Sequence, residues 1–175
     1  LEYSFFVKNS MSGKIVEFPS KLFVNDKGNS IYTVNFGLPE SNTTLNGDNV
    51  IYRSKEKYNY LLYSNNKIFL INDNIAENNY LLKDNAPNML WVITNETKLS
   101  DNVELTKAKI QFRGRDYVAW FNPLIKVNVG PWKFTNVPGL IYEVYDSNDS
   151  FRWVLVNKRK IPTESIKNPF SDIES

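Results

Sequence analysis

Basic and aromatic residues gather in two neighbouring stretches of the chain, where together they could bind an anion or a flat ring. The set comprises Arg113, Arg115, Trp120, Trp132 and Lys133. A guanidinium binds a carboxylate through two parallel hydrogen bonds, and it also stacks on an indole face. A polar hairpin tip beside two core tryptophans has the same composition, so this purely structural interpretation stays open beside the binding one.

A second candidate site is the segment 130–140, which reads GPWKFTNVPGL. We expect Pro138 and Gly139 to form a type II corner, because proline presets φ and glycine accepts a positive φ. Trp132 and Phe134 would then anchor a partner protein, since buried aromatics dominate the affinity of interfaces. Alternatively, the two rings plug the open end of a sheet and the segment is structural.

The motifs between about Asn88 and Asp146 stand in a recognisable order. They are Leu90-Trp91-Val92-Ile93-Thr94, Glu96-Thr97-Lys98, Lys107-Ala108, Arg113-Gly114 with Ala119-Trp120, Gly130-Pro131-Trp132-Lys133-Phe134, and Asn136-Val137-Pro138-Gly139-Leu140-Ile141. This order resembles the GLPGLI family, extracytoplasmic proteins of the Bacteroidetes named for a Gly-Leu-Pro-Gly-Leu-Ile core. Here Asn136 and Val137 replace the first Gly and Leu. Asparagine is the best non-glycine substitute where φ is positive.

The resemblance implies a location and no reaction. It implies a protein of the periplasm or the outer-membrane surface, reached after removal of a signal peptide. In that setting we expect a non-enzymatic accessory protein that acts through a protein partner, such as an outer-membrane transporter or assembly factor. The alternative is a carrier that holds an apolar ligand, such as a lipid, in the concave face of a half-barrel.

Composition excludes several kinds of chemistry. The 175 residues include no cysteine and no histidine, which excludes disulfides, thiol nucleophiles, Cys/His zinc sites and Ser-His-Asp triads. A net charge of +2 is too small to indicate a nucleic-acid partner. We expect no cofactor and, because no run of about 18 apolar residues occurs, no transmembrane segment.

Three carboxylates lie near the candidate segments, namely Asp116, Glu143 and Asp146. An acid and a base need separated pKa values, and nothing in the pattern separates these. We therefore predict no catalytic residues. The turn from Asp146 to Ser150 is rich in oxygen ligands but lacks a complete calcium-loop pattern, so we predict no metal site either.

Short apolar runs separated by turn residues predict an all-β fold. The stretch 103–112 alternates, with Ala108, Ile110 and Phe112 on the core side. Pro19 interrupts the run 14–25, which predicts an edge strand or a bulge there. The polar stretch 73–79 could hold one helical turn.

We expect about ten strands in one strongly curved antiparallel sheet or open half-barrel, with little helix. Residues 1–161 would form this single domain. Residues 162–175 would form a C-terminal tail that packs over the domain or frays.

Overall fold

The computed structural model describes residues 1–36, 59–65, 67–75, 78–160 and 169–170. These residues form strands and no helix, so none of them belongs to a membrane-spanning helix. The stretch 37–49, whose many turn-forming residues predict a long loop, lies outside the described residues. The strands are β1 (Glu2–Lys8), β2 (Ile15–Val24), β3 (Ser30–Asn35), β4 (Asn59–Ser64), β5 (Ile68–Ile75), β6 (Asn78–Asn85), β7 (Val92–Ser100), β8 (Val103–Phe112), β9 (Arg115–Asn122), β10 (Leu140–Asp146) and β11 (Phe151–Asn157).

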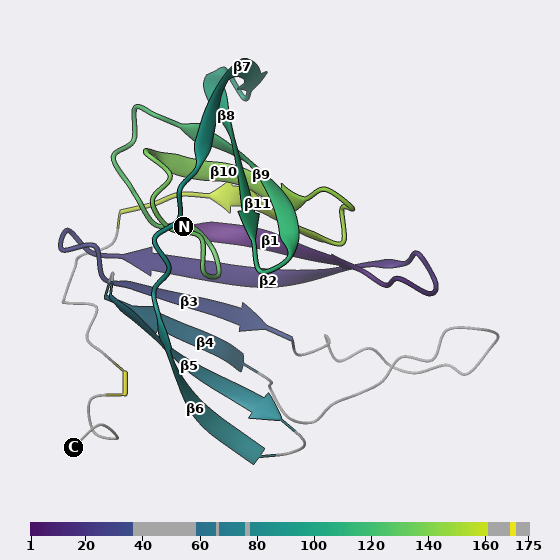
Figure 1. Ribbon diagram of the computed structural model, residues 1–175, viewed down its shortest axis with the longest axis vertical. Helices are drawn as coiled ribbons and strands as arrows, with labels where there is room; N and C mark the ends of the chain where they lie inside the picture. Colours follow the sequence, from purple (N-terminus) through teal and green to yellow (C-terminus); the bar gives the residue numbers. More distant parts are fainter. Residues whose placement is uncertain (37–58, 66, 76–77, 161–168, 171–175) are drawn as a thin grey trace.

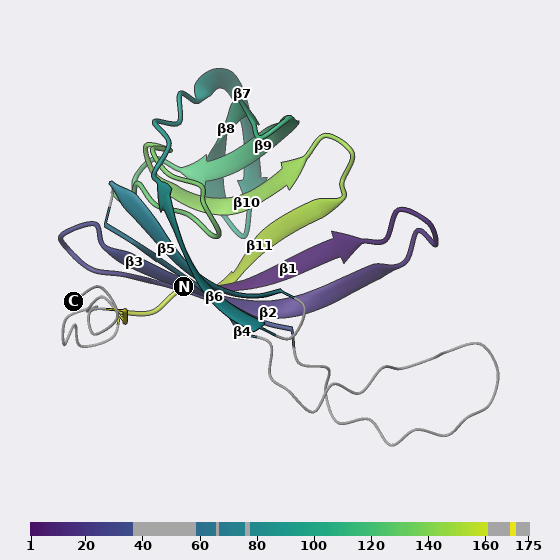
Figure 2. The same ribbon diagram turned by 60° about the horizontal axis from the view of Figure 1, so that its bottom comes forward.

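All eleven strands join in one antiparallel sheet, in the order β6-β5-β4-β3-β2-β1-β11-β10-β9-β8-β7 (Figure 1). The prediction of a single antiparallel all-β sheet is confirmed. The sheet is not closed, because β6 and β7 remain as its two edges. It is also not strongly curled, so the strong curvature expected from the sequence is not found. The usual twist between neighbouring strands accumulates across it, so the strand direction turns progressively from one edge to the other (Figure 2).

Two features of this order differ from a simple series of hairpins. The first and last strands pair in the middle of the sheet, where Phe5 of β1 lies opposite Trp153 of β11. Strands β6 and β7 are consecutive in sequence but lie at opposite edges. The linker 86–91 between them must therefore cross one face of the sheet, and Figure 1 shows it running between the two halves.

The crossing linker packs against the loop 123–139, which joins β9 to β10. The indole N–H of Trp91 donates to the carbonyl of Thr135 at 2.8 Å. The backbone N–H of Thr135 in turn donates to the sulfur of Met89 at 3.4 Å. Linker and loop together cover one face of the sheet, and the core lies between them and the strands.

Alternate residues of the strands point into this core, as the pleat of a β-strand requires. Strand β8 follows the prediction, since Ala108 belongs to the core cluster and Ile110 and Phe112, partly buried, pack against it. The largest fully buried side chains include Tyr3, Tyr32, Phe69, Phe121 and Phe134. The largest side chains of the core are therefore aromatic.

The opposite face carries a smaller apolar cluster. Phe170 packs there with Tyr63 and Leu70, beside the partly buried Ile31 and Ile68. Phe170 belongs to the predicted tail, so at this residue the tail packs over the sheet.

The prediction that Pro19 marks an edge strand or a bulge is wrong. Strand β2 lies between β1 and β3 and keeps regular register at Pro19. Leu1 and Leu22 exchange hydrogen bonds, and along an antiparallel ladder such pairs alternate with pairs that are not hydrogen-bonded. The backbone nitrogen of Pro19 therefore points away from β1 and towards β3. The pairing of β2 with β3 starts only at Ser20. The missing N–H of Pro19 therefore removes no hydrogen bond from the ladder.

One expectation about local structure also fails. The described part of 73–79 is extended and belongs to the β5–β6 pair, so no helical turn forms there. Strand β7 ends at Ser100, and Asp101 and Asn102, which follow it, both adopt positive φ. Two such residues make the turn that β-hairpins prefer, and this turn joins β7 directly to β8.

The corner at Pro138 differs from the predicted type II turn. The N–H of Gly139 donates to the carbonyl of Val137 at 2.8 Å, which makes a three-residue turn around Pro138. The positive φ falls on Asn136, at 64°, and not on Gly139. Position 139 requires glycine for space: a Cβ there would lie 2.8 Å from the carbonyl carbon of Asn122.

We predict that Gly139→Ala lowers the free energy of unfolding by about 3 kcal/mol, because the new methyl group would overlap the backbone of β9. Gly114→Ala is the matched control. Gly114 has a φ of 75°, but a Cβ added there would meet nothing within 4 Å, so only the backbone conformation opposes alanine, at about 1–2 kcal/mol. Urea unfolding measures both variants. Equal losses at the two positions would contradict the close-approach explanation.

Candidate functional site

A pocket of about 360 Å³ lies on the core side of the sheet. Small-molecule sites in proteins have volumes of roughly 300–1,000 Å³, so this pocket is large enough for a small ligand. Its walls come from β1, β3, β9 and β11, from the β8–β9 turn and from the loop 123–139. The lining residues are Phe5, Tyr32, Val34, Phe36, Arg113, Arg115, Tyr117, Trp132, Phe151 and Trp153.

Parallel aromatic rings form one wall of the pocket. The ring of Trp153 stacks on Phe5, with centroids 4.6 Å apart and planes inclined by 10°. Trp132 also lies parallel to Trp153, with ring centroids 6.0 Å apart. The indole N–H of Trp153 donates to the hydroxyl of Tyr32 at 2.8 Å, and burial raises the pKa of Tyr32, which keeps it neutral. The wall is therefore apolar, and the indole N–H of Trp153 and the hydroxyl of Tyr32 are hydrogen-bonded to each other.

Trp132 reaches the pocket from a tight turn in the loop 123–139. The N–H of Phe134 donates to the carbonyl of Pro131 at 3.2 Å, and the N–H of Gly130 donates to the carbonyl of Phe134 at 2.7 Å. Trp132 has a φ of 52° in this turn, at the position after Pro131 where glycine is usual. A left-handed conformation costs a bulky residue about 1–2 kcal/mol.

Two arginines are the charged residues of the lining. Arg113 pairs with Asp84 of β6 at 2.5 Å, and Arg115 pairs with Asp146 at 2.9 Å while lying 4.9 Å from the centre of the Phe151 ring. The two guanidinium side chains are 50% and 41% exposed. Neither carboxylate belongs to the lining. The solvent-facing side of the pocket therefore carries positive charge.

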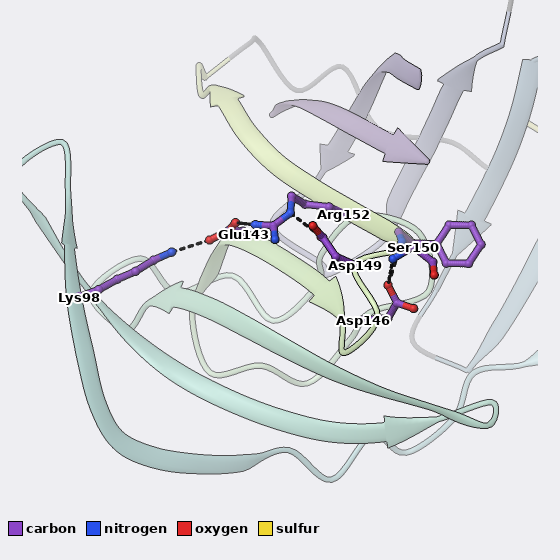
Figure 3. Close-up of polar contacts among 7 residues, drawn as sticks. Lys98, Glu143, Asp146, Asp149, Ser150 and Arg152 are labelled. Carbon is purple, nitrogen blue, oxygen red and sulfur yellow. Dashed lines mark hydrogen bonds and ion pairs between the residues drawn. The ribbon is translucent and has the colours of Figure 1, made fainter. Parts of the chain in front are cut away.

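Asp146 has a structural role. Its side chain is almost fully buried, and one carboxylate oxygen accepts the backbone N–H groups of Ser150 and Phe151 at 2.7 and 2.8 Å (Figure 3). The other oxygen accepts a hydrogen bond from the guanidinium of Arg115. All of these contacts hold the β10–β11 turn and the start of β9, which explains the oxygen-rich composition of 146–150.

Glu143 belongs to a different network, which also appears in Figure 3. It accepts hydrogen bonds from Lys98 of β7, at 2.5 Å, and from Arg152 of β11, which also pairs with Asp149. Asp116, the third carboxylate considered, is exposed at the start of β9. The structure thus gives each of the three carboxylates a separate environment. The described residues contain no cluster of three groups able to hold a metal ion.

Trp120 does not join the other members of the predicted basic-aromatic group. Its ring lies under Lys98 and Lys107, whose amino groups are 4.7 and 5.6 Å from the ring centre. Strand alternation places Trp120 on the face opposite Tyr117, Ala119 and the core. The structure therefore brings Arg113, Arg115 and Trp132 together and leaves Trp120 on the other side of the sheet.

Lys133 and Phe134 are buried beneath the pocket-forming turn. The amino group of Lys133 donates to Asp84 at 2.9 Å and lies 5.6 Å from the centre of the Phe69 ring. Phe134 is fully buried, with its ring against Tyr117 and Trp153. Phe134 thus fills the interior, as the plugging alternative expects. Pro138 is exposed and Gly139 is buried at the three-residue corner, and neither lines the pocket.

Most of the pocket wall is not among the site residues predicted from the sequence. Phe5, Tyr32, Phe151 and Trp153 come from three strands that are far apart in the sequence. The alternation in FRWVLVN could have placed Phe151 and Trp153 on one face. Nothing in the sequence, however, indicated that the last strand pairs with the first.

Comparisons with known proteins add a fold and no activity. No family model matches the chain, and no curated protein matches it. Among solved structures, the chain is similar to PNGF-II, determined in space group P21, with a TM-score of 0.53 and 15% identity. The match covers 95% of this chain and 30% of that one, so this chain spans less than a third of the length of PNGF-II. At this identity the likeness shows the fold alone.

We predict that Asp84→Asn destabilises the protein at neutral pH, because it leaves the buried amino group of Lys133 without its carboxylate. Asp84 is 38% exposed, so after allowance for solvent screening we expect a loss of about 1–2 kcal/mol. The exposed Glu96, which pairs with Lys107, provides the matched control: Glu96→Gln should change stability little.

The same pair makes stability depend on pH. The hydrogen bond from Lys133, helped by Arg113, lowers the pKa of Asp84 in the folded protein. The stabilisation is therefore complete above the unfolded value of about 3.9 and is lost as the pH falls through the lower folded value. Urea unfolding at pH 7 and at pH 3 gives the free energy of unfolding of the unchanged protein and of Asp84→Asn. The difference between the two proteins should be smaller at pH 3 than at pH 7. A difference that is equal at both values would contradict this assignment.

Proposed function

We propose that this protein is a non-enzymatic binding protein whose pocket holds a small, mainly apolar molecule. The observation that carries the proposal is the aromatic pocket of about 360 Å³ on the core side of the sheet. Of the functions expected from the sequence, it favours the carrier of an apolar ligand, in a form where rings of several strands and a loop make the binding surface.

The rigidity of the pocket wall supports this proposal. The stacked rings of Phe5, Trp153 and Trp132 come from two paired strands and from a loop that is hydrogen-bonded at both ends of its turn. A preformed wall spares the ligand the entropic cost of ordering side chains, which otherwise reduces affinity by about 0.5–1.5 kcal/mol for each side chain immobilised. Each Å² of apolar ligand surface removed from water adds about 25 cal/mol.

The setting is part of the proposal and rests on the motif order around Gly130 and Gly139. Like the GLPGLI proteins that it resembles, the protein would work beyond the inner membrane, in the periplasm or at the outer membrane. In that setting the binding protein would carry or present its ligand and leave it chemically unchanged.

A protein partner in the outer membrane is the second candidate, and the edge strand β7 is the observation that favours it. Val92, Ile93 and Leu99 of this strand, and Leu90 just before it, are all more than half exposed. Exposed edge strands pair readily with strands of other proteins. Ile93→Lys should abolish co-purification with a stoichiometric envelope protein, whereas Leu124→Lys, on an exposed loop position, should not. If Ile93→Lys still co-purifies with the envelope protein, or if Leu124→Lys also abolishes co-purification, this edge is not the interface.

We predict that the neutral dye N-phenyl-1-naphthylamine binds in the pocket and gains fluorescence there. Val34→Phe should weaken this binding by about tenfold or more, because the added ring fills space that the dye needs. Phe36→Ala should keep or improve binding, because it enlarges the same space. Trp120→Ala, on the opposite face, is the matched control and should bind the dye as the unchanged protein does.

Fluorescence titration measures all four proteins, with circular dichroism to verify their folding. Dye binding that Trp120→Ala reduces and Val34→Phe leaves unchanged would place the site elsewhere. That result, or no binding at all, would reject the proposed function.

A further inference from the structure

The backbone conformations around the pocket single out two of its residues. Among the described residues, six that are not glycine have a positive φ. Four of them are Asp101, Asn102, Asn136 and Asp149, and Asp and Asn are the types that accept this conformation most readily. The two exceptions are Arg113 and Trp132, and both line the pocket.

The turn around Arg113 does not explain the choice of arginine. Arg113 and Gly114, with φ of 50° and 75°, form a two-residue turn between the paired residues Phe112 and Arg115. Such turns favour Asn-Gly or Asp-Gly. The neighbouring β7–β8 hairpin follows that preference, with Asp101 in the equivalent first position. An arginine is therefore present at 113 for its side chain and not for the turn.

The turn around Trp132 leads to the same conclusion. In a β-turn, a positive φ at the first central position is normally found at glycine. The tryptophan ring lies parallel to Trp153 and meets the edge of Phe112 at a centroid distance of 5.8 Å. Residues in strained conformations are concentrated at ligand sites, where they contribute to function. Trp132 and Arg113 thus combine strain with direct access to one pocket.

We propose, on the basis of the proposed function, that the ligand is an anion that carries a flat ring system. Its ring lies against Trp132 and Trp153. Its carboxylate or sulfonate accepts hydrogen bonds from Arg113 and Arg115, the guanidinium groups on the solvent-facing side.

The charges around the pocket match a single anionic group. The local ion pairs join three cations to two carboxylates, which leaves one positive charge in excess; these groups are Arg113, Arg115, Lys133, Asp84 and Asp146. The two carboxylates lie outside the lining, so an anion in the pocket meets the cations directly. A guanidinium has five N–H donors, and the contacts to Asp84 and Asp146 occupy one nitrogen of each arginine. Donors remain to bind the ligand.

Two dyes of nearly the same shape test this inference. N-phenyl-1-naphthylamine is neutral, and 8-anilinonaphthalene-1-sulfonate adds one sulfonate to the same rings. Arg113→Asn replaces the arginine by the residue that the turn prefers, so the midpoint of urea unfolding should not fall. We expect this variant to bind the sulfonate dye about tenfold more weakly and the neutral dye within about twofold of the unchanged protein.

Two further variants complete the design. Trp132→Gly places the usual residue in the other strained turn and should weaken both dyes, because it removes the ring that they share as a contact. Lys27→Asn removes an exposed cation outside the lining and should change neither affinity.

The outcomes separate the two proposals. If Arg113→Asn binds the sulfonate dye as well as the unchanged protein does, the anion is not bound by this arginine and the inference is wrong. Neutral-dye binding that Val34→Phe still blocks would then leave the proposed function standing. Equal weakening of the sulfonate dye by Lys27→Asn would reveal a non-specific charge effect and would also overturn the inference.

Discussion

The position of β6 and β7 at opposite edges of one sheet is the constraint on which the rest of the structure depends. Because the two strands are consecutive, the chain between them has to cross a face that would otherwise be open. A crossing segment needs partners for its polar groups, and the loop 123–139 supplies them through Thr135. The same loop places Trp132 and Phe134 against Trp153 of β11. The core, the pocket and the edge at β7 all follow from this connection.

Asp84 ties the start of the crossing to the site. It lies near the end of β6 and forms ion pairs with Lys133 of the loop and with Arg113 of the β8–β9 turn. Strands from the two halves of the sheet are thereby joined on the pocket side through one carboxylate. The ion pair with Arg113 is solvent-exposed and contributes little energy by itself, but it orients the guanidinium beside the pocket. Structural and binding roles thus meet at this group.

The sequence predicted what depends on local pattern. The alternation of Ala108, Ile110 and Phe112 identified the core side of β8, and the conformational preference of asparagine anticipated the positive φ at Asn136. It could not predict what depends on long-range pairing. The missing N–H of Pro19 is harmless only because the neighbouring ladder starts one residue later, which no local pattern reveals.

The candidate site was predictable to the same extent. Arg113, Arg115 and Trp132 were identified from their types, and the structure brings them to one pocket. Trp120 was grouped with them because it is close in sequence, yet strand alternation turns it to the other face. Phe5 and Trp153 were missed because they meet only through the pairing of the first strand with the last.

The central claim is that ligand binds on the core side of the sheet, and the tryptophan indole N–H signals test it most directly. The chain has four tryptophans; Trp132 and Trp153 line the pocket, whereas Trp120 lies on the opposite face. In a proton–nitrogen correlation spectrum titrated with 8-anilinonaphthalene-1-sulfonate, the account predicts that the Trp132 and Trp153 signals move and the Trp120 signal stays. Movement of Trp120 with Trp132 and Trp153 unchanged would contradict it.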